Sequence, residues 1–173
     1  MPTRPPAFAK QGFAEDDVID FTPELKRLAL EEVRKYRVGP LYTPPSVQGT
    51  IVMPGAIGGG GWGGGAFDPE TGVLYVKATN NPALFKLFPV EMPSDTLQAR
   101  FMVELGRSLG IQPALPGAAE GSRVPELPVH KPPYGTLTAI DLNRGEQLWQ
   151  VTLGDEPSIR NHPLLRGVTL PPL

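Results

Sequence analysis

The chain carries few side chains that could work together as acids, bases, nucleophiles or metal ligands. It has two histidines, His130 and His162, and no cysteine. The lack of cysteine excludes disulfides, thiolate catalysis, cysteine–zinc sites and C-x-x-C-H haem attachment. Both histidines stand alone in proline-rich stretches, where we expect solvated side chains rather than ligands. The sequence therefore predicts no metal-ligating residue.

Two aspartates, Asp68 and Asp141, each stand at the start of a turn, where an acid accepts a hydrogen bond from its own backbone two residues on. Neither has a histidine or second acid nearby in sequence to form an acid–base pair, so we predict no catalytic residue. Lys77 and the pair Asn80–Asn81 could line a pocket. A polar, solvated surface is the interpretation that we favour for them.

Residues 55–65 form a glycine-rich run that contains Trp62. The glycines Gly59, Gly61 and Gly64 match G-x-G-x-x-G, but a dinucleotide fold needs a helix next, and a turn at 68–72 follows instead. No Gly-Lys-Ser/Thr sequence follows, which excludes a phosphate loop. Two interpretations stay open: a flexible surface loop, or a bare backbone that closely approaches something flat and bulky.

The elements that would position these residues are mostly strands. Thr22-Pro23-Glu24 predicts the start of a helix over about 23–37, which Gly39-Pro40 ends. Strands are predicted at 49–54 and 73–79, at 135–142 and at 146–153; the last two form a hairpin around Asn143-Arg144-Gly145. We expect 73–79 and the hairpin to share one antiparallel sheet. Residues 80–133 are predicted as a proline-rich loop with one helical patch near 96–109, and residues 1–21 and 155–173 as an extended arm and a tail.

Composition narrows the class of protein further. The 173 residues have a net charge of −2, and the 16 basic residues form no stripe that would indicate nucleic-acid binding. No apolar run approaches the roughly 20 residues of a membrane span, and the N-terminus has no signal-peptide pattern. Twenty glycines and 22 prolines, with apolar strand-like runs, indicate a turn-rich β protein.

Two motifs resemble those of quinoprotein dehydrogenases. Residues 139–149 resemble the tryptophan-docking motif A-x-D-x-x-T-G-x-x-x-W of quinoprotein propellers, with Arg144 in place of the threonine; residues 66–72 match its first half. In that family the tryptophan, here Trp149, packs against the neighbouring blade. Residues 49–69 resemble the segment of PQQ-dependent glucose dehydrogenases that passes beneath the cofactor: G-T, two apolar residues, x-P-G, a glycine-rich loop, W-G-G and D-P.

The resemblance covers residues 40–155 and implies PQQ, held by Ca²⁺ in the parent enzyme, as cofactor for oxidising a sugar or alcohol hydroxyl. It implies that Gly60, Gly61, Trp62 and Gly63 contact the cofactor; a core tryptophan at the start of a blade is the other interpretation of Trp62. Ala56 stands where the family suggests an asparagine. The family's catalytic aspartate, quinone-contacting lysine and Ca²⁺ ligands lie upstream of the matching region, with no counterpart before Val47.

We therefore expect a mainly β chain, a partial propeller of about one blade with a flanking strand, an N-terminal helix and a proline-rich insertion. Its expected parts are arm and helix (1–46), blade strands (47–80 and 134–154), insertion (81–133) and tail (155–173). The function that this implies is a fragment of a periplasmic PQQ-dependent dehydrogenase, inactive alone, whose partners are the remaining blades or a second copy. The alternative is a propeller-repeat scaffold that binds proteins without catalysis.

Overall fold

The protein is described by a computed structural model that places residues 4–90, 101–113 and 125–173. Its main feature is a four-stranded antiparallel sheet in the order β2-β3-β8-β9, formed by Gly60–Asp68, Val73–Thr79, Gly135–Asp141 and Glu146–Thr152. A four-stranded antiparallel sheet of this kind is the unit of a β-propeller blade. The expected pairing of the strand at 73–79 with the C-terminal hairpin is confirmed, since β3 pairs with β8 along its whole length.

The two turns of this sheet follow from the residues that begin and end them. The Asp68 carboxylate accepts hydrogen bonds from the Glu70 backbone N–H (3.0 Å) and the Thr71 hydroxyl (2.6 Å). Asp141 accepts one from the Asn143 N–H (2.8 Å) in the same way. Gly72 and Gly145 end the turns with φ of 72° and 66°, a conformation that glycine adopts without strain. Both aspartates are therefore turn caps, as predicted.

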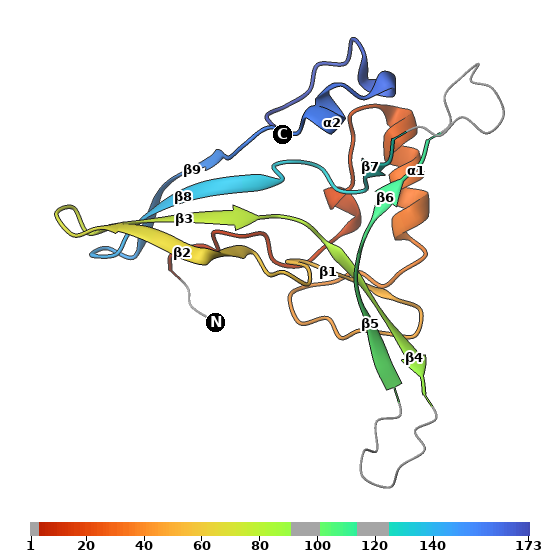
Figure 1. Ribbon diagram of the computed structural model, residues 1–173, viewed down its shortest axis with the longest axis horizontal. Helices are drawn as coiled ribbons and strands as arrows, with labels where there is room; N and C mark the ends of the chain where they lie inside the picture. The colour runs from red at the N-terminus through yellow and green to blue at the C-terminus, as the bar shows by residue number, and fades with distance from the viewer. Residues whose placement is uncertain (1–3, 91–100, 114–124) are drawn as a thin grey trace, which may run out of the picture.

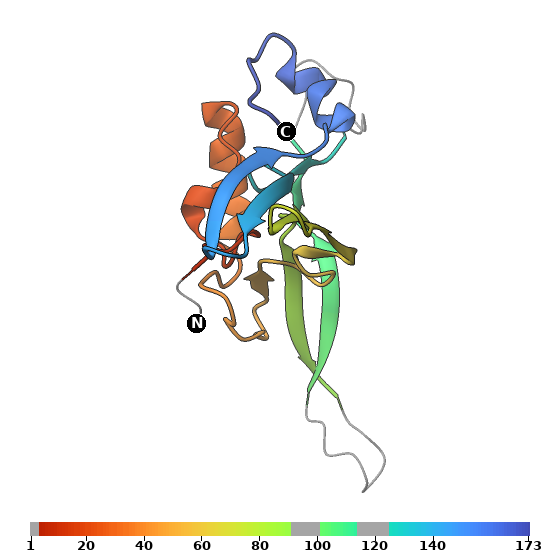
Figure 2. The same cartoon turned by 90° about the vertical axis from the view of Figure 1, so that its left-hand side faces the viewer.

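The prediction for residues 80–133 was wrong. Instead of a loop with a helical patch, β4 (Ala83–Pro89) and β5 (Phe101–Ser108) form a long hairpin, and β1 (Thr50–Val52) pairs with β4 to make a three-stranded sheet. Residues 101–108 of the expected helical patch are strand, and 96–100 lie outside the described residues. Pairing with β4 satisfies the backbone hydrogen-bonding groups of β5, whatever the spacing of apolar side chains along β5. The hairpin projects from the body as an arm (Figures 1 and 2).

Helix α1 (Pro23–Val33) begins where the sequence predicts and ends earlier, with Arg34 as its C-cap. The Thr22 hydroxyl oxygen accepts a hydrogen bond from the Leu25 backbone N–H at 3.2 Å, which satisfies one of the free donors of the first turn. The buried face of α1 packs into the main core and consists of Leu25, Ala29 and Val33.

Both ends of the chain belong to that core, which corrects the expectation of a plain arm and a plain tail. Phe13, Val18 and Ile19 are buried, and the arm, which includes the short helix η1 (Glu15–Asp17), crosses from the four-stranded sheet to α1 (Figure 1). The tail forms α2 (Pro157–Arg160) and η2 (Pro163–Leu165) and buries the side chains of Ile159, Leu165 and Leu173. The two-residue strands β6 (Gly110–Ile111) and β7 (Leu127–Pro128) complete this region.

Candidate functional site

The second half of the glycine-rich run belongs to a strand, and residues 55–59 form the turn that leads into it. Strand β2 starts at Gly60, and its pairing with β3 jumps from Gly60–Ala78 to Gly65–Val76, so residues 61–64 bulge out of the ladder. Trp62, within this bulge, is fully exposed. The interpretation of Trp62 as a core tryptophan is therefore wrong for this chain, and its indole is free to contact another molecule.

The glycines of the run fall into two groups. A Cβ on Gly59 would lie 2.5 Å from the Ala9 Cβ and one on Gly65 2.7 Å from the Tyr75 carbonyl oxygen, so no side chain fits at these two positions. A Cβ on Gly61 would lie 2.5 Å from the Lys77 Cε, the far end of a flexible side chain that can shift. By contrast, nothing lies within 4 Å of such an atom on Gly63 or Gly64. The run therefore combines packed glycines, which fix its path, with bare backbone beside Trp62. This arrangement fits the approach of a flat group.

Lys77 lies against this segment. Its aliphatic chain covers Gly61, and its side chain is exposed. Among the described residues no carboxylate forms an ion pair with it. The bulge thus presents an aromatic ring, bare backbone and a positive charge close together, a combination suited to a planar anion.

Asn80 and Asn81, next along the chain, have different roles. The Asn80 side chain is buried; it accepts a hydrogen bond from the Lys10 backbone N–H (3.0 Å) and donates one to the Pro133 carbonyl (3.0 Å). This makes it a structural link between the arm and the segment that leads into β8, not part of a polar surface. Asn81 lines a separate cavity, so the pocket interpretation, which we did not favour from the sequence, holds for this residue.

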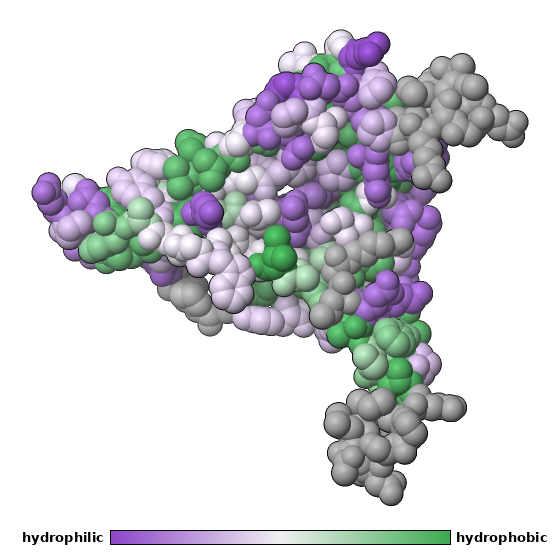
Figure 3. Space-filling view, in the orientation of Figure 1, coloured by the Kyte–Doolittle hydropathy of each residue, from purple (hydrophilic) through white to green (hydrophobic). Residues whose placement is uncertain are grey.

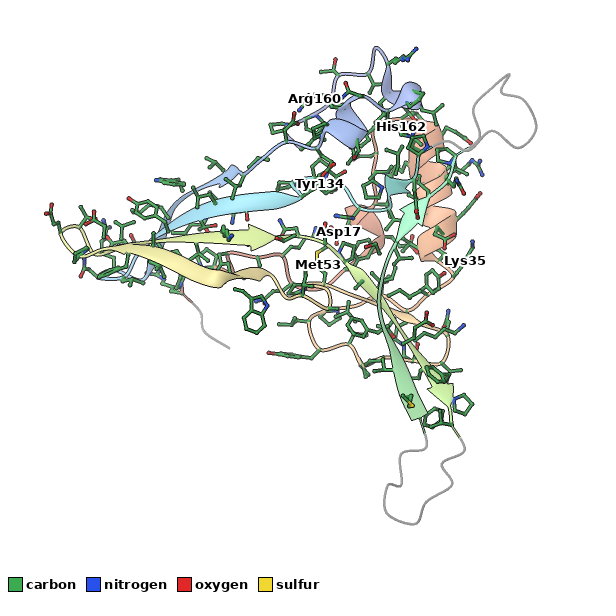
Figure 4. The ribbon with its side chains drawn as sticks, in the orientation of Figure 1. Asp17, Lys35, Met53, Tyr134, Arg160 and His162 are labelled. Atoms are coloured by element: carbon green, nitrogen blue, oxygen red, sulfur yellow. The ribbon has the colours of Figure 1, made fainter. Side chains whose placement is uncertain are left out.

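That cavity has a volume of about 470 Å³ and lies between the end of β3, the start of β8, the β6–β7 pair and the tail. Its polar lining includes His130 and Tyr134, whose rings meet edge to face with centroids 5.0 Å apart. Tyr134 lies inward between the sheet and the segment that carries Arg160 (Figure 4). The expectation that His130 is solvated was wrong, since its side chain is buried.

Burial also sets the protonation of these two groups. It lowers the pKa of the His130 imidazole to about 4, so the ring is neutral at neutral pH; the nearby Asn80 backbone and the Asp17 carboxylate oppose this shift more weakly. Burial, with a smaller contribution from the Glu156 carboxylate, raises the pKa of the Tyr134 hydroxyl. Neither ring nitrogen of His130, nor the Tyr134 hydroxyl, has a hydrogen-bond partner with good geometry in the described part of the chain.

His162, also expected to be solvated, is buried and has a structural role. Its Nε2 contacts the Pro125 carbonyl oxygen at 2.9 Å, and its Nδ1 accepts the Leu164 backbone N–H at 3.2 Å. Within residues 4–90, 101–113 and 125–173 there is no cluster of three histidine or acidic side chains that could hold a metal ion. The same residues include no helix long and apolar enough to cross a lipid bilayer.

Comparisons with known proteins agree on one family. The model of the family described as "PQQ: Glucose/ethanol/alcohol dehydrogenase, beta-propeller domain" matches residues 1–171. A quinate/shikimate dehydrogenase (quinone) of Acinetobacter baylyi is 29% identical over 154 residues, which is 86% of this chain and 19% of that protein. A quinoprotein glucose dehydrogenase of Escherichia coli is 32% identical over 120 residues, 66% of this chain and 15% of that protein.

A third relative, the glycerol dehydrogenase large subunit of Gluconobacter thailandicus, is 29% identical over 174 residues, 88% of this chain and 23% of that protein. The chain thus spans less than a quarter of each of these three relatives. No solved structure matches it.

Proposed function

The chain belongs to the family of PQQ-dependent glucose, ethanol and alcohol dehydrogenase β-propeller domains, and on that basis we propose that it forms one side of a PQQ pocket. Gly60, Gly61, Trp62 and Gly63 would contact the cofactor. The observation that carries this proposal is the fully exposed Trp62 beside backbone with open space around it. An indole ring and bare peptide groups can lie against a flat quinone without steric conflict.

Lys77 extends this surface with charge. PQQ is planar and carries three carboxylates, and the aliphatic part of Lys77 lies beside Gly61, while its ammonium group has no carboxylate partner among the described residues. We assign it an ion pair with one cofactor carboxylate. The described residues fit the organic cofactor but provide no cluster for Ca²⁺, so the metal ligands of the parent enzyme would come from elsewhere.

Bound PQQ would supply the acceptor for the two electrons taken from a hydroxyl-bearing carbon. This chain's contribution is to hold one face of the ring system and to exclude water from it. Oxidation also needs a base for the hydroxyl proton and a metal beside the quinone oxygen. The described residues form no cluster for the metal, and we assign the base to none of them. We propose that the chain alone is inactive and acts with the remaining blades, in a periplasmic enzyme that oxidises a sugar or an alcohol.

We treat residues 1–173 as one propeller-fragment domain, because the arm, helix and tail share one core with β1 and β4. A protein-binding scaffold is the second candidate function. It is favoured by three exposed apolar side chains on β9, which could pack against a partner protein without any cofactor: Leu148, Trp149 and Val151.

Fluorescence separates the two candidates. The chain has two tryptophans, so in a Trp149→Phe variant all tryptophan emission comes from Trp62. We expect PQQ to quench this emission saturably, more than it quenches free N-acetyltryptophanamide at equal absorbance.

The Lys77→Met variant should weaken PQQ binding roughly three- to tenfold and reduce the salt dependence of binding. The matched control is Lys86→Met, an exposed lysine on β4, which should bind like the parent. Quenching that never exceeds the free indole control would contradict the cofactor surface.

The predicted lack of activity has its own test. We expect the chain with PQQ, Ca²⁺ and glucose to reduce a dye no faster than free PQQ. The control is Trp62→Ala. Saturable glucose oxidation that this substitution abolishes would mean that the chain holds a catalytic base that we have not identified.

A further inference from the structure

The N-terminal arm lies against the start of the glycine-rich run. A Cβ added to Gly59 would lie 2.5 Å from the Ala9 Cβ, which is too short for a real contact. The two backbones can therefore approach this closely only because Gly59 has no side chain and Ala9 has a small one. A Cβ added to Gly60 would lie 3.7 Å from two ring carbons of Phe8, an ordinary van der Waals distance. Residues 8 and 9 thus form a surface on which the run rests.

The N-terminal arm is itself tied to the rest of the protein on both sides of this contact. The Phe8 carbonyl oxygen accepts a hydrogen bond from the Gln150 side chain on β9 at 3.0 Å. The Gly12 backbone N–H donates to the carbonyl of Met53, just after β1, at 2.8 Å. Between these points the Asn80 side chain accepts a hydrogen bond from the backbone of the arm at 3.0 Å. These bonds fix the height of residues 8–12 relative to the sheet.

The opposite side of the run is tied to β3. The Gly59 carbonyl accepts a hydrogen bond from the Thr79 backbone N–H at 2.8 Å, and Gly60 pairs with Ala78. Gly59 and Gly60 are therefore held both by β3 and by the N-terminal arm, whereas regular pairing with β3 resumes only after the bulge. Trp62 stands two residues beyond this fixed point. The direction in which its indole leaves the sheet depends on what holds the two glycines.

Phe8 and Ala9 do not belong to the main hydrophobic core. Phe8 is half-buried and Ala9 is buried, but neither is part of the core cluster that includes Phe13 and Ile19 of the same arm. Core packing accounts for the later arm residues, whereas Phe8 and Ala9 both lie against the glycine run. We propose that these two are positioning residues: they hold the start of the bulge so that Trp62 is presented in one orientation. The inference rests on the proposed function, because a fixed Trp62 matters for contact with the cofactor.

A bulge that is fixed in advance binds more tightly, since less conformational freedom is lost when PQQ binds. If loss of the Phe8 ring leaves the bulge in its binding conformation for about a fifth of the time, the apparent dissociation constant rises about fivefold. Phe8 and Ala9 are uncharged, so their substitution leaves the charge of the surface as it was. They should therefore affect the affinity for PQQ without changing its salt dependence, unlike Lys77.

The first measurement needs no PQQ. In the Trp149→Phe chain all tryptophan emission comes from Trp62, and the decay of its anisotropy reports how freely the indole moves. We expect Phe8→Ala to enlarge the fast component of the decay. Phe8→Leu, which keeps an apolar side chain against Gly60, should restore most of the slow component.

A second substitution tests the close approach of the backbones. Ala9→Leu forces the N-terminal arm away from Gly59 and should enlarge the fast component as Phe8→Ala does. Ala7→Leu is the matched control, because Ala7 is an exposed residue of the same arm; it should behave like the parent. Far-ultraviolet circular dichroism reports whether each variant is folded. If the core of a variant fails to fold, Gln150→Ala is the milder substitute: it removes the amide that holds the Phe8 carbonyl and should give a smaller change of the same kind.

Titration with PQQ gives the second readout. Phe8→Ala and Ala9→Leu should raise the dissociation constant roughly fivefold, with the same dependence on salt as the parent. The positioning role is overturned if these variants leave the anisotropy decay of Trp62 unchanged, or if Ala7→Leu alters it equally. Quenching that never exceeds the free indole control in the parent would instead contradict the cofactor surface, and the anisotropy decay would still decide whether the N-terminal arm orients Trp62.

Discussion

At the scale of single residues, the neutral, buried His130 makes stability depend on pH. Its pKa is about 4 in the folded protein and about 6.5 when the chain is unfolded, so between these values the unfolded state binds more protons. Stability is therefore complete above pH 6.5 and falls as the pH drops towards 4. This difference in pKa corresponds to roughly 3 kcal/mol at most.

Urea unfolding at several pH values between 7 and 4 measures this loss. The His130→Gln variant should have a flatter profile over the same range, because the group that titrates is gone. The exposed carboxylates contribute equally to both proteins, so the difference between the two profiles isolates His130. Parallel profiles would show that the ring is not buried as neutral imidazole.

The turn roles of Asp68 and Asp141 were predictable from the sequence because their partners lie two or three residues away. The burial of His130 was not predictable, since the segments that cover it are distant in sequence: Val18, which pairs with it, is an example. The burial of Leu127 and Val129, two positions apart, is a local signal of a strand-like, covered stretch there.

At the scale of elements, hairpins with a local turn were predictable and the long β4–β5 arm was not. The turns after β2 and β8 have recognisable aspartate and glycine residues. The connection between β4 and β5 contains ten residues outside the described part, and the apolar residues of this region loosely imitate helical spacing: Leu97, Phe101, Val103, Leu105 and Leu109. The exposed apolar side chains of Phe101, Met102 and Val103, with Phe88 across the pair, lie along the arm that Figure 3 shows reaching down from the body.

The helix cap gives a prediction at this scale. Thr22→Ala removes the oxygen that accepts the Leu25 N–H, so we expect a loss of about 1 kcal/mol in the free energy of unfolding. Thr169→Ala, an exposed threonine in the tail, is the control and should change stability by no more than about 0.5 kcal/mol. Denaturant titration followed by far-ultraviolet circular dichroism measures both. Equal effects of the two substitutions would exclude a capping role.

At the scale of the whole molecule, the four-stranded sheet has apolar side chains that no described residue covers. Trp149 touches Tyr75, with ring centroids 5.9 Å apart, but is still 41% exposed. Val151 on the same strand and Leu153 just after it are also exposed. β2 and β9 also form the two open edges of the sheet. Apolar faces and free strand edges promote pairing with another chain.

We therefore predict that the protein forms dimers or larger assemblies in solution. Light scattering coupled to gel filtration should give a mass above that of the 18.6 kDa chain, rising with concentration. Val151→Glu, which places a charge in the exposed apolar face, should shift the equilibrium towards monomer. Glu70→Gln, on an exposed turn of the same sheet, should leave the mass unchanged. A monomeric mass for the parent at high concentration would refute the prediction.

The N-terminal arm has a consequence for how the chain reaches this fold. Its Phe8 carbonyl accepts a hydrogen bond from the Gln150 side chain at 3.0 Å, a contact between residues 142 positions apart. Further along the arm, the backbone N–H of Gly12 donates to the Met53 carbonyl, and that of Ile19 donates to the Val129 carbonyl. On a ribosome the arm emerges before these partners and meets Gln150 only after the residues between them have been made. Contacts of such high sequence separation slow folding, so we expect the arm to dock late and the blade hairpins, with their local turns, to form before it.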